Sequence, residues 1–142
     1  MMEIAMKRII FATACFFGFF SAASASPDPW YRGGRIADVE VEMRSTFPSG
    51  SCLVGTFMSS SVSALGIQGI RVRPDAEFWF HHAHDHNPRS TPWDINPDAT
   101  RYLLRNIKPA LRDEVLSRLP ENTQWVIYTG SDLIRRFGYR SC

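Results

Sequence analysis

The clearest pattern along the chain is an alternation of apolar and charged residues between Asp38 and Arg44. Apolar side chains on one face and charged side chains on the other are typical of a half-buried antiparallel strand. Turn-forming residues follow at 47–51, and a second strand is predicted from Cys52 to Met58. The two strands would form a hairpin, which the serines at 59–61 would end.

Two more short strands are predicted, Gln68–Arg73 and Glu77–His82, with a turn between them. In the later strand Phe78 and Phe80 face one way and Trp79 faces the other. The chain then becomes polar, so a loop is expected from Ala83 to Asn96.

A helix is predicted to begin at Asn96, because a capping side chain is followed by proline and an acid. Pro109 interrupts its apolar stripe, which indicates a kinked helix or two segments ending at Leu119. Gln124–Thr129 is rich in β-formers and predicts a strand. Leu133–Cys142 predicts a last strand, or a short helix plus a strand.

This order of elements predicts an α+β fold. One version is an OB-like five-stranded barrel with a kinked helix between strands three and four. The other is a helix packed on a small antiparallel sheet. The length suits a single domain, residues 26–142.

The first 25 residues have the features of a signal peptide. Lys7 and Arg8 precede an apolar run, Ile9–Phe20, which is too short to span a bilayer. Ala23-Ser24-Ala25 gives a cleavage pattern, so we expect a cut after Ala25 and a secreted or periplasmic protein. No later stretch predicts a membrane span.

Removing the signal peptide also removes Cys15 and leaves Cys52 and Cys142. In an exported chain, two cysteines most simply form one internal disulfide. Two free thiols, or an intermolecular bond through Cys142, are the alternatives. The remaining charge is nearly balanced, at 14 basic and 13 acidic residues. This balance argues against a nucleic-acid-binding protein.

All four histidines lie in one hexapeptide with an aspartate. If the strand before it continued, the side chains of His82, His84 and His86 would share one side, with His81 and Asp85 on the other. Imidazole groups at this spacing can bind zinc or copper. Two alternatives remain: a solvated loop without a ligand, and a pH-sensitive cluster of imidazoles.

Other catalytic motifs are absent from the sequence, including a Gly-x-Ser-x-Gly elbow and a phosphate-binding glycine loop. We therefore expect no enzyme activity, except one that depends on a metal. Trp30, Tyr31 and Trp93 fall in predicted loops, where aromatic rings suit recognition of a glycan or a protein. Trp79 and Trp125 are expected to cap the core.

The stretch from Val39 to Ser59, including Cys52-Leu53-Val54-Gly55-Thr56-Phe57-Met58, resembles the receptor-binding B subunits of pertussis-type AB5 toxins. The later helix and the C-terminal cysteine add to the likeness. The resemblance implies an exported OB fold that assembles into rings and binds glycans. The chain departs from it in having two cysteines after signal cleavage and a histidine-rich loop before the helix.

These observations predict an exported binding protein that recognises a glycan or a partner protein. One alternative is a periplasmic metal-binding protein that uses His81–His86. Another is an inhibitor or immunity protein that inserts a loop into a secreted enzyme.

Overall fold

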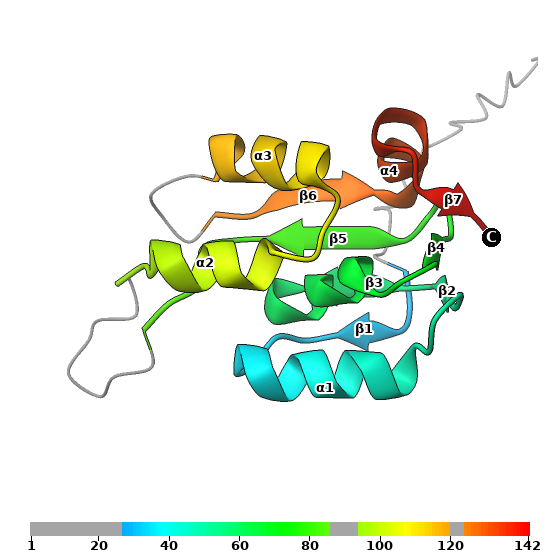
Figure 1. The fold of residues 1–142 in the computed structure, drawn as a ribbon. Coiled ribbons are helices and arrows are strands. Elements are labelled where there is room, and N and C mark those ends of the chain that lie inside the picture. Colours follow the sequence, from blue (N-terminus) through cyan, green and yellow to red (C-terminus); the bar gives the residue numbers. More distant parts are fainter. Residues whose placement is uncertain (1–26, 86–93, 120–123) are drawn as a thin grey trace, which may run out of the picture.

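The computed structural model describes residues 27–85, 94–119 and 124–142, and combines helices with two small sheets (Figure 1). The chain therefore has the predicted α+β architecture. The expected signal peptide lies outside the described residues.

The larger sheet has four strands in the order β1 (Trp30–Tyr31), β3 (Thr56–Met58), β5 (Glu77–Phe80) and β6 (Val126–Thr129). β1, β3 and β5 run parallel to one another, and only β6 is antiparallel to its neighbour. The antiparallel pairing expected from the sequence is thus limited here to β5 and β6.

The smaller sheet consists of β2 (Cys52–Leu53), β4 (Arg71–Val72) and β7 (Arg140–Ser141), which are all parallel. Cys52 and Cys142 form a disulfide with their Cα atoms 5.9 Å apart, which confirms the predicted internal bond. The strand predicted from Cys52 to Met58 is divided. Gly55, at φ +106°, separates β2 from β3, and the two parts enter different sheets.

The segment predicted as the first strand is a helix, α1 (Ile36–Thr46), so the predicted hairpin is wrong. The reason is that a two-residue alternation also places apolar residues four positions apart. Val39 and Met43 are one helical turn apart and both are buried, whereas Val41 between them is 59 % exposed.

The parallel strands are joined by helical connections. α1 links β1 to the segment that enters β3, and the 3₁₀ helix η1 (Ser59–Gly66) lies between β3 and β5. Such connections are what parallel neighbours require. The described strands form two open sheets, so an OB-like barrel is not confirmed.

The predicted helix after Asn96 is present as two helices, α2 (Pro97–Leu104) and α3 (Pro109–Arg118). The Asn96 side chain accepts a hydrogen bond from the backbone N–H of Ala99 at 2.9 Å, so the predicted cap is confirmed. Pro109 begins α3, which settles the sequence alternatives in favour of two segments.

The last part of the chain is a short helix plus a strand, the second of the two predicted alternatives. Helix α4 (Gly130–Phe137) starts with a capping box between Thr129 and Asp132. It ends at Gly138, whose φ of +70° lets the chain turn into β7.

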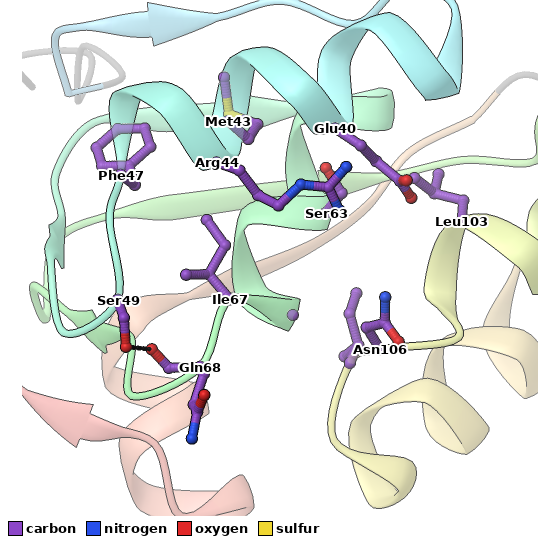
Figure 2. A pocket seen from close by; sticks show the side chains of 12 residues that line it. Glu40, Met43, Arg44, Phe47, Ser49, Ser63, Ile67, Gln68, Leu103 and Asn106 are labelled. Atoms are coloured by element: carbon purple, nitrogen blue, oxygen red, sulfur yellow. Dashed lines mark hydrogen bonds between the residues drawn. The ribbon is translucent and has the colours of Figure 1, made fainter.

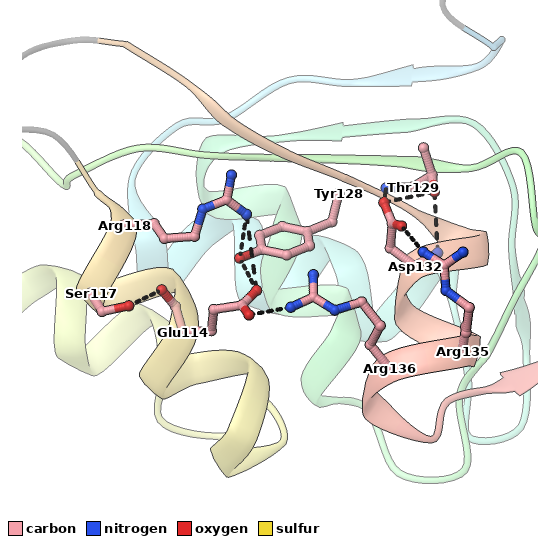
Figure 3. Close-up of polar contacts among 8 residues, drawn as sticks. All are labelled: Glu114, Ser117, Arg118, Tyr128, Thr129, Asp132, Arg135 and Arg136. Carbon is pink, nitrogen blue, oxygen red and sulfur yellow. Dashed lines mark hydrogen bonds and ion pairs between the residues drawn. The ribbon is translucent and has the colours of Figure 1, made fainter.

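The core lies on one face of the four-stranded sheet. Phe57, Phe78, Phe80 and Tyr128 point to this face and are at most 1 % exposed. Helix α3 is held there by Glu114, which accepts a hydrogen bond from the Tyr128 hydroxyl at 2.6 Å and pairs with Arg136 of α4 (Figure 3). The helices therefore cover this face of the sheet.

Candidate functional site

The other face of the four-stranded sheet carries a row of tryptophans. The strand register aligns Trp79 with Met58 on one side and with Ile127 on the other. Because side chains alternate along a strand, Trp79 points away from Phe78 and Phe80, as the sequence predicted. Trp30 on β1 and Trp125, just before β6, complete what we call the tryptophan row: Trp30, Trp79 and Trp125.

Each ring of the row contacts the next one in space, and the row remains accessible. The ring centroids of Trp30 and Trp79 are 5.7 Å apart, and those of Trp79 and Trp125 are 5.8 Å apart. Trp30 is 40 % exposed and Trp125 is 38 % exposed, while Ile127 beside them is 45 % exposed. The indole N–H of Trp79 donates to the Glu77 carboxylate at 2.9 Å, so the central ring is held in place.

A hollow of about 290 Å³ adjoins this row, and the indoles of Trp30 and Trp125 both line it. Met58 and Gly33 provide further apolar and backbone surface, and Arg32 and Ser59 provide polar groups. The hollow combines aromatic walls with a few polar side chains, which is the usual composition of a small-ligand site.

The histidine segment begins where β5 ends. Strand geometry stops at Phe80, so the predicted alternation does not extend through Asp85. The rings of His81 and His84 lie 5.3 Å apart, although the alternation predicted them on opposite sides. The His82 ring instead lies 3.5 Å from the hydroxyl of Thr100 on α2.

His81 connects the histidine segment to the tryptophan row. Its ring meets Trp125 edge to face, with centroids 4.5 Å apart. Burial lowers the pKa of His81 below its ordinary value, and the nearby His84 and His82 lower it further, while a contact with the His82 carbonyl opposes the change.

A larger hollow of about 580 Å³ lies beside these histidines. His81, His84, Arg35 and Ser59 are among its lining residues, at the carboxyl ends of β1, β3 and β5. Crevices at this edge of a parallel sheet often hold ligands. Since Ser59 lines both hollows, the two adjoin.

Among residues 27–85, 94–119 and 124–142, no group of three or more histidine, cysteine or acidic side chains could hold a metal. His82, His84, His81 and Asp85 thus do not form such a group, and His86 lies outside the described residues. The predicted zinc or copper site remains a prediction.

The aromatic residues proposed from the sequence lie in different places. Trp30 belongs to the tryptophan row, and Trp93 lies outside the described residues. Tyr31 points to the core face, where its ring stacks on Phe57 at 4.6 Å. We therefore leave Tyr31 out of the candidate surface.

Sequence reasoning placed Trp79 and Trp125 in the core and missed Arg32 and Met58. Strand alternation alone places Trp125 and Ile127 on the face opposite Val126 and Tyr128, but all four residues are apolar, so only the structure shows that Val126 and Tyr128 are the buried pair. The pairing with β1 was not visible in the sequence, since parallel neighbours here are 26 positions apart.

Comparison with protein families, with characterised proteins and with solved structures finds no match to this chain. Within the part of the chain that the structure describes, no helix has both the length and the apolar character needed to cross a membrane.

Proposed function

We propose that this protein is an exported, disulfide-bonded binding protein that recognises glycans through the tryptophan row. The observation that carries the proposal is the accessible row of three indoles on the face of the sheet opposite the core. Export rests on the sequence features of residues 1–25, and the Cys52–Cys142 bond suits an oxidising compartment.

The chemistry of the row suits sugars. A sugar ring presents C–H groups on its faces, which pack on aromatic rings, and hydroxyls at its edges, which need polar partners. Trp30 and Trp125 supply the aromatic surface, while Arg32 and Ser59 supply polar groups in the same hollow. A volume of about 290 Å³ fits a small saccharide unit better than a broad protein contact.

The proposal is tested by titrating the purified exported protein with a panel of neutral and acidic oligosaccharides. Isothermal titration calorimetry and tryptophan fluorescence are the two readouts. At least one saccharide should bind and change the fluorescence. Trp30→Ala and Trp125→Ala should each weaken that binding by about tenfold or more, because each removes an aromatic face.

Val41→Ala is the control. Val41 is 59 % exposed on α1 and lines neither the hollow beside the tryptophan row nor the one beside the histidines. It should bind the saccharide like the wild type. The proposal fails if no saccharide of the panel binds, or if both tryptophan variants retain wild-type affinity.

The toxin-subunit version of the proposal adds assembly into a ring, as the B-subunit resemblance implies. Native mass spectrometry of the exported protein tests this version separately. A monomer at micromolar concentration would exclude the ring and leave glycan binding to be decided by the titration.

A further inference from the structure

A third pocket lies between α1, η1 and the segment that joins α2 to α3 (Figure 2). Its volume is about 330 Å³, within the range of small-molecule sites. Its walls are largely apolar, formed by Met43, Phe47, Ile67, Leu103 and Ile107. None of its lining residues belongs to the tryptophan row.

One wall of this pocket contains a buried polar group, the hydroxyl of Ser63. Its hydroxyl oxygen is buried and, among the described residues, has no hydrogen-bond partner. Buried hydroxyls are normally paired, because leaving one unpaired costs stability. Ser63 also lines the pocket, so a ligand there could supply the missing partner.

Arg44 gives the pocket a positive charge. Figure 2 shows its side chain extending from α1 over the pocket, and no acidic group of the described residues lies within 4.0 Å of its guanidinium. Glu40 also lines the pocket, but both its carboxylate oxygens already accept hydrogen bonds from Arg105, at 2.7 and 2.9 Å. The charge of Glu40 is thus balanced, and that of Arg44 is left over.

These groups select a type of ligand. We infer that the pocket binds a small organic carboxylate with an apolar body. The carboxylate would pair with the Arg44 guanidinium and accept a hydrogen bond from the Ser63 hydroxyl. The body, a single aromatic ring or a short branched chain, would pack between Met43, Phe47 and Ile67. Phosphate fits less well, since the walls would leave most of its oxygens without partners.

The experiment is a titration of the exported protein with phenylacetate and 3-methylbutanoate, followed by ¹⁵N–¹H NMR. Phenylacetamide, the neutral analogue of phenylacetate, is the matched probe. At least one acid should shift the amide signals of pocket residues. Phenylacetate should bind roughly tenfold or more tightly than phenylacetamide, because only the acid pairs with Arg44.

Two variants separate binding from folding. Arg44→Gln should abolish the preference for the acid over the amide, and the exposure of Arg44 predicts that the fold is kept. Ser63→Ala should weaken binding several-fold while the melting temperature of the ligand-free protein stays equal or rises, since an unpaired hydroxyl is removed. Arg140→Gln, an exposed arginine outside the pocket, should leave binding unchanged.

The inference is overturned if neither acid shifts any pocket amide at about 10 mM, a concentration that would reveal even weak binding. It is equally overturned if Arg44→Gln binds the acid as tightly as the wild type does. Because the tryptophan row is a separate surface, these outcomes do not bear on glycan binding.

Discussion

Arg105 and Glu40 are 65 positions apart in the sequence and form a two-pronged ion pair that ties the end of α2 to α1. The guanidinium donates to both carboxylate oxygens, at 2.7 and 2.9 Å. The Glu40 side chain is only 8 % exposed, and the guanidinium also lies 3.7 Å above the Tyr102 ring. The pair is therefore the polar link between two helices that the sequence separates widely.

Removing the cation from this pair should be costly. Arg105→Ala would leave a buried carboxylate uncompensated, so the free energy of unfolding should fall by about 3 kcal/mol. Urea denaturation followed by circular dichroism measures this value. Arg112→Ala is the control, because its partner Asp113 is 71 % exposed and its loss should cost about 0.5 kcal/mol or less. Equal costs for the two variants would contradict the assignment.

The disulfide between Cys52 and Cys142 should contribute strongly to the stability of the fold. It connects residues 90 positions apart, so reduction should lower the free energy of unfolding by about 4 kcal/mol in the chain-entropy model. Cys52→Ala, Cys142→Ala and the double variant should all show the same loss. Denaturation with and without reductant checks the value, and a double variant as stable as the oxidised wild type would refute it.

Glu114 should make the protein sensitive to acid. The pKa of its carboxyl lies below the ordinary value, chiefly because Tyr128 donates a hydrogen bond to it, and Arg136 and Arg118 add to the effect. Since the folded pKa is lowered, this stabilisation is complete above about pH 4.5 and is lost as the pH falls through the folded pKa.

Glu114→Gln should therefore cost about 1–2 kcal/mol at neutral pH and much less in acid, where the wild-type carboxyl is also uncharged. Denaturation curves from pH 3 to 7 test this convergence. The neighbouring Asp113→Asn, on an exposed residue, should leave the pH profile unchanged. Parallel wild-type and Glu114→Gln profiles would show that Glu114 is not the acid-sensitive group.

His81 should resist protonation in the folded protein. Burial between Trp125 and His84 lowers its pKa, and His82 and His84 add like charge once they are protonated. Stability should therefore decline as the pH falls below about 6.5, the unfolded value. NMR titration of the imidazole, assigned with a His81→Phe variant, should give a midpoint below 6.5. A midpoint at or above that value would contradict the burial argument.

Two glycines with left-handed backbone should differ sharply in their tolerance of a side chain. A Cβ on Gly55, at φ +106°, would lie 2.1 Å from the Pro29 carbonyl oxygen. A Cβ on Gly50, at φ +80°, would meet nothing within 4 Å. Gly50→Ala should lower the free energy of unfolding by about 1–2 kcal/mol, the cost of holding a residue with a Cβ in a left-handed backbone conformation. Gly55→Ala adds a steric clash to this cost and should lower the free energy of unfolding by at least about 3 kcal/mol. Thermal denaturation of both variants tests the order, and a smaller loss at Gly55 would contradict it.

Several features could be predicted from the sequence because short-range chemistry decides them. Asn96 and Pro97 start α2, and Pro109 separates α3 from it, since a cap and a ring-locked φ act within one helical turn. The opposite faces of Phe78 and Trp79 follow from strand alternation. The pairing of Cys52 with Cys142 is not a short-range feature, and it was predicted by counting the two cysteines expected to remain after cleavage of the predicted signal peptide.

Other features were decided only by the tertiary structure. Val39 and Met43 fit either a strand or a helix, and their burial as part of α1 selects the helix. The parallel pairing of β1 with β3 depends on a helical crossover, which strand propensity cannot reveal. The accessibility of Trp125 and the pairing of Glu40 with Arg105 likewise arise between distant segments, and so does the lack of a partner for the Ser63 hydroxyl among the described residues. Local chemistry determined where α2 and α3 begin, while packing between distant segments determined the helical form of α1 and which side chains are left available for binding.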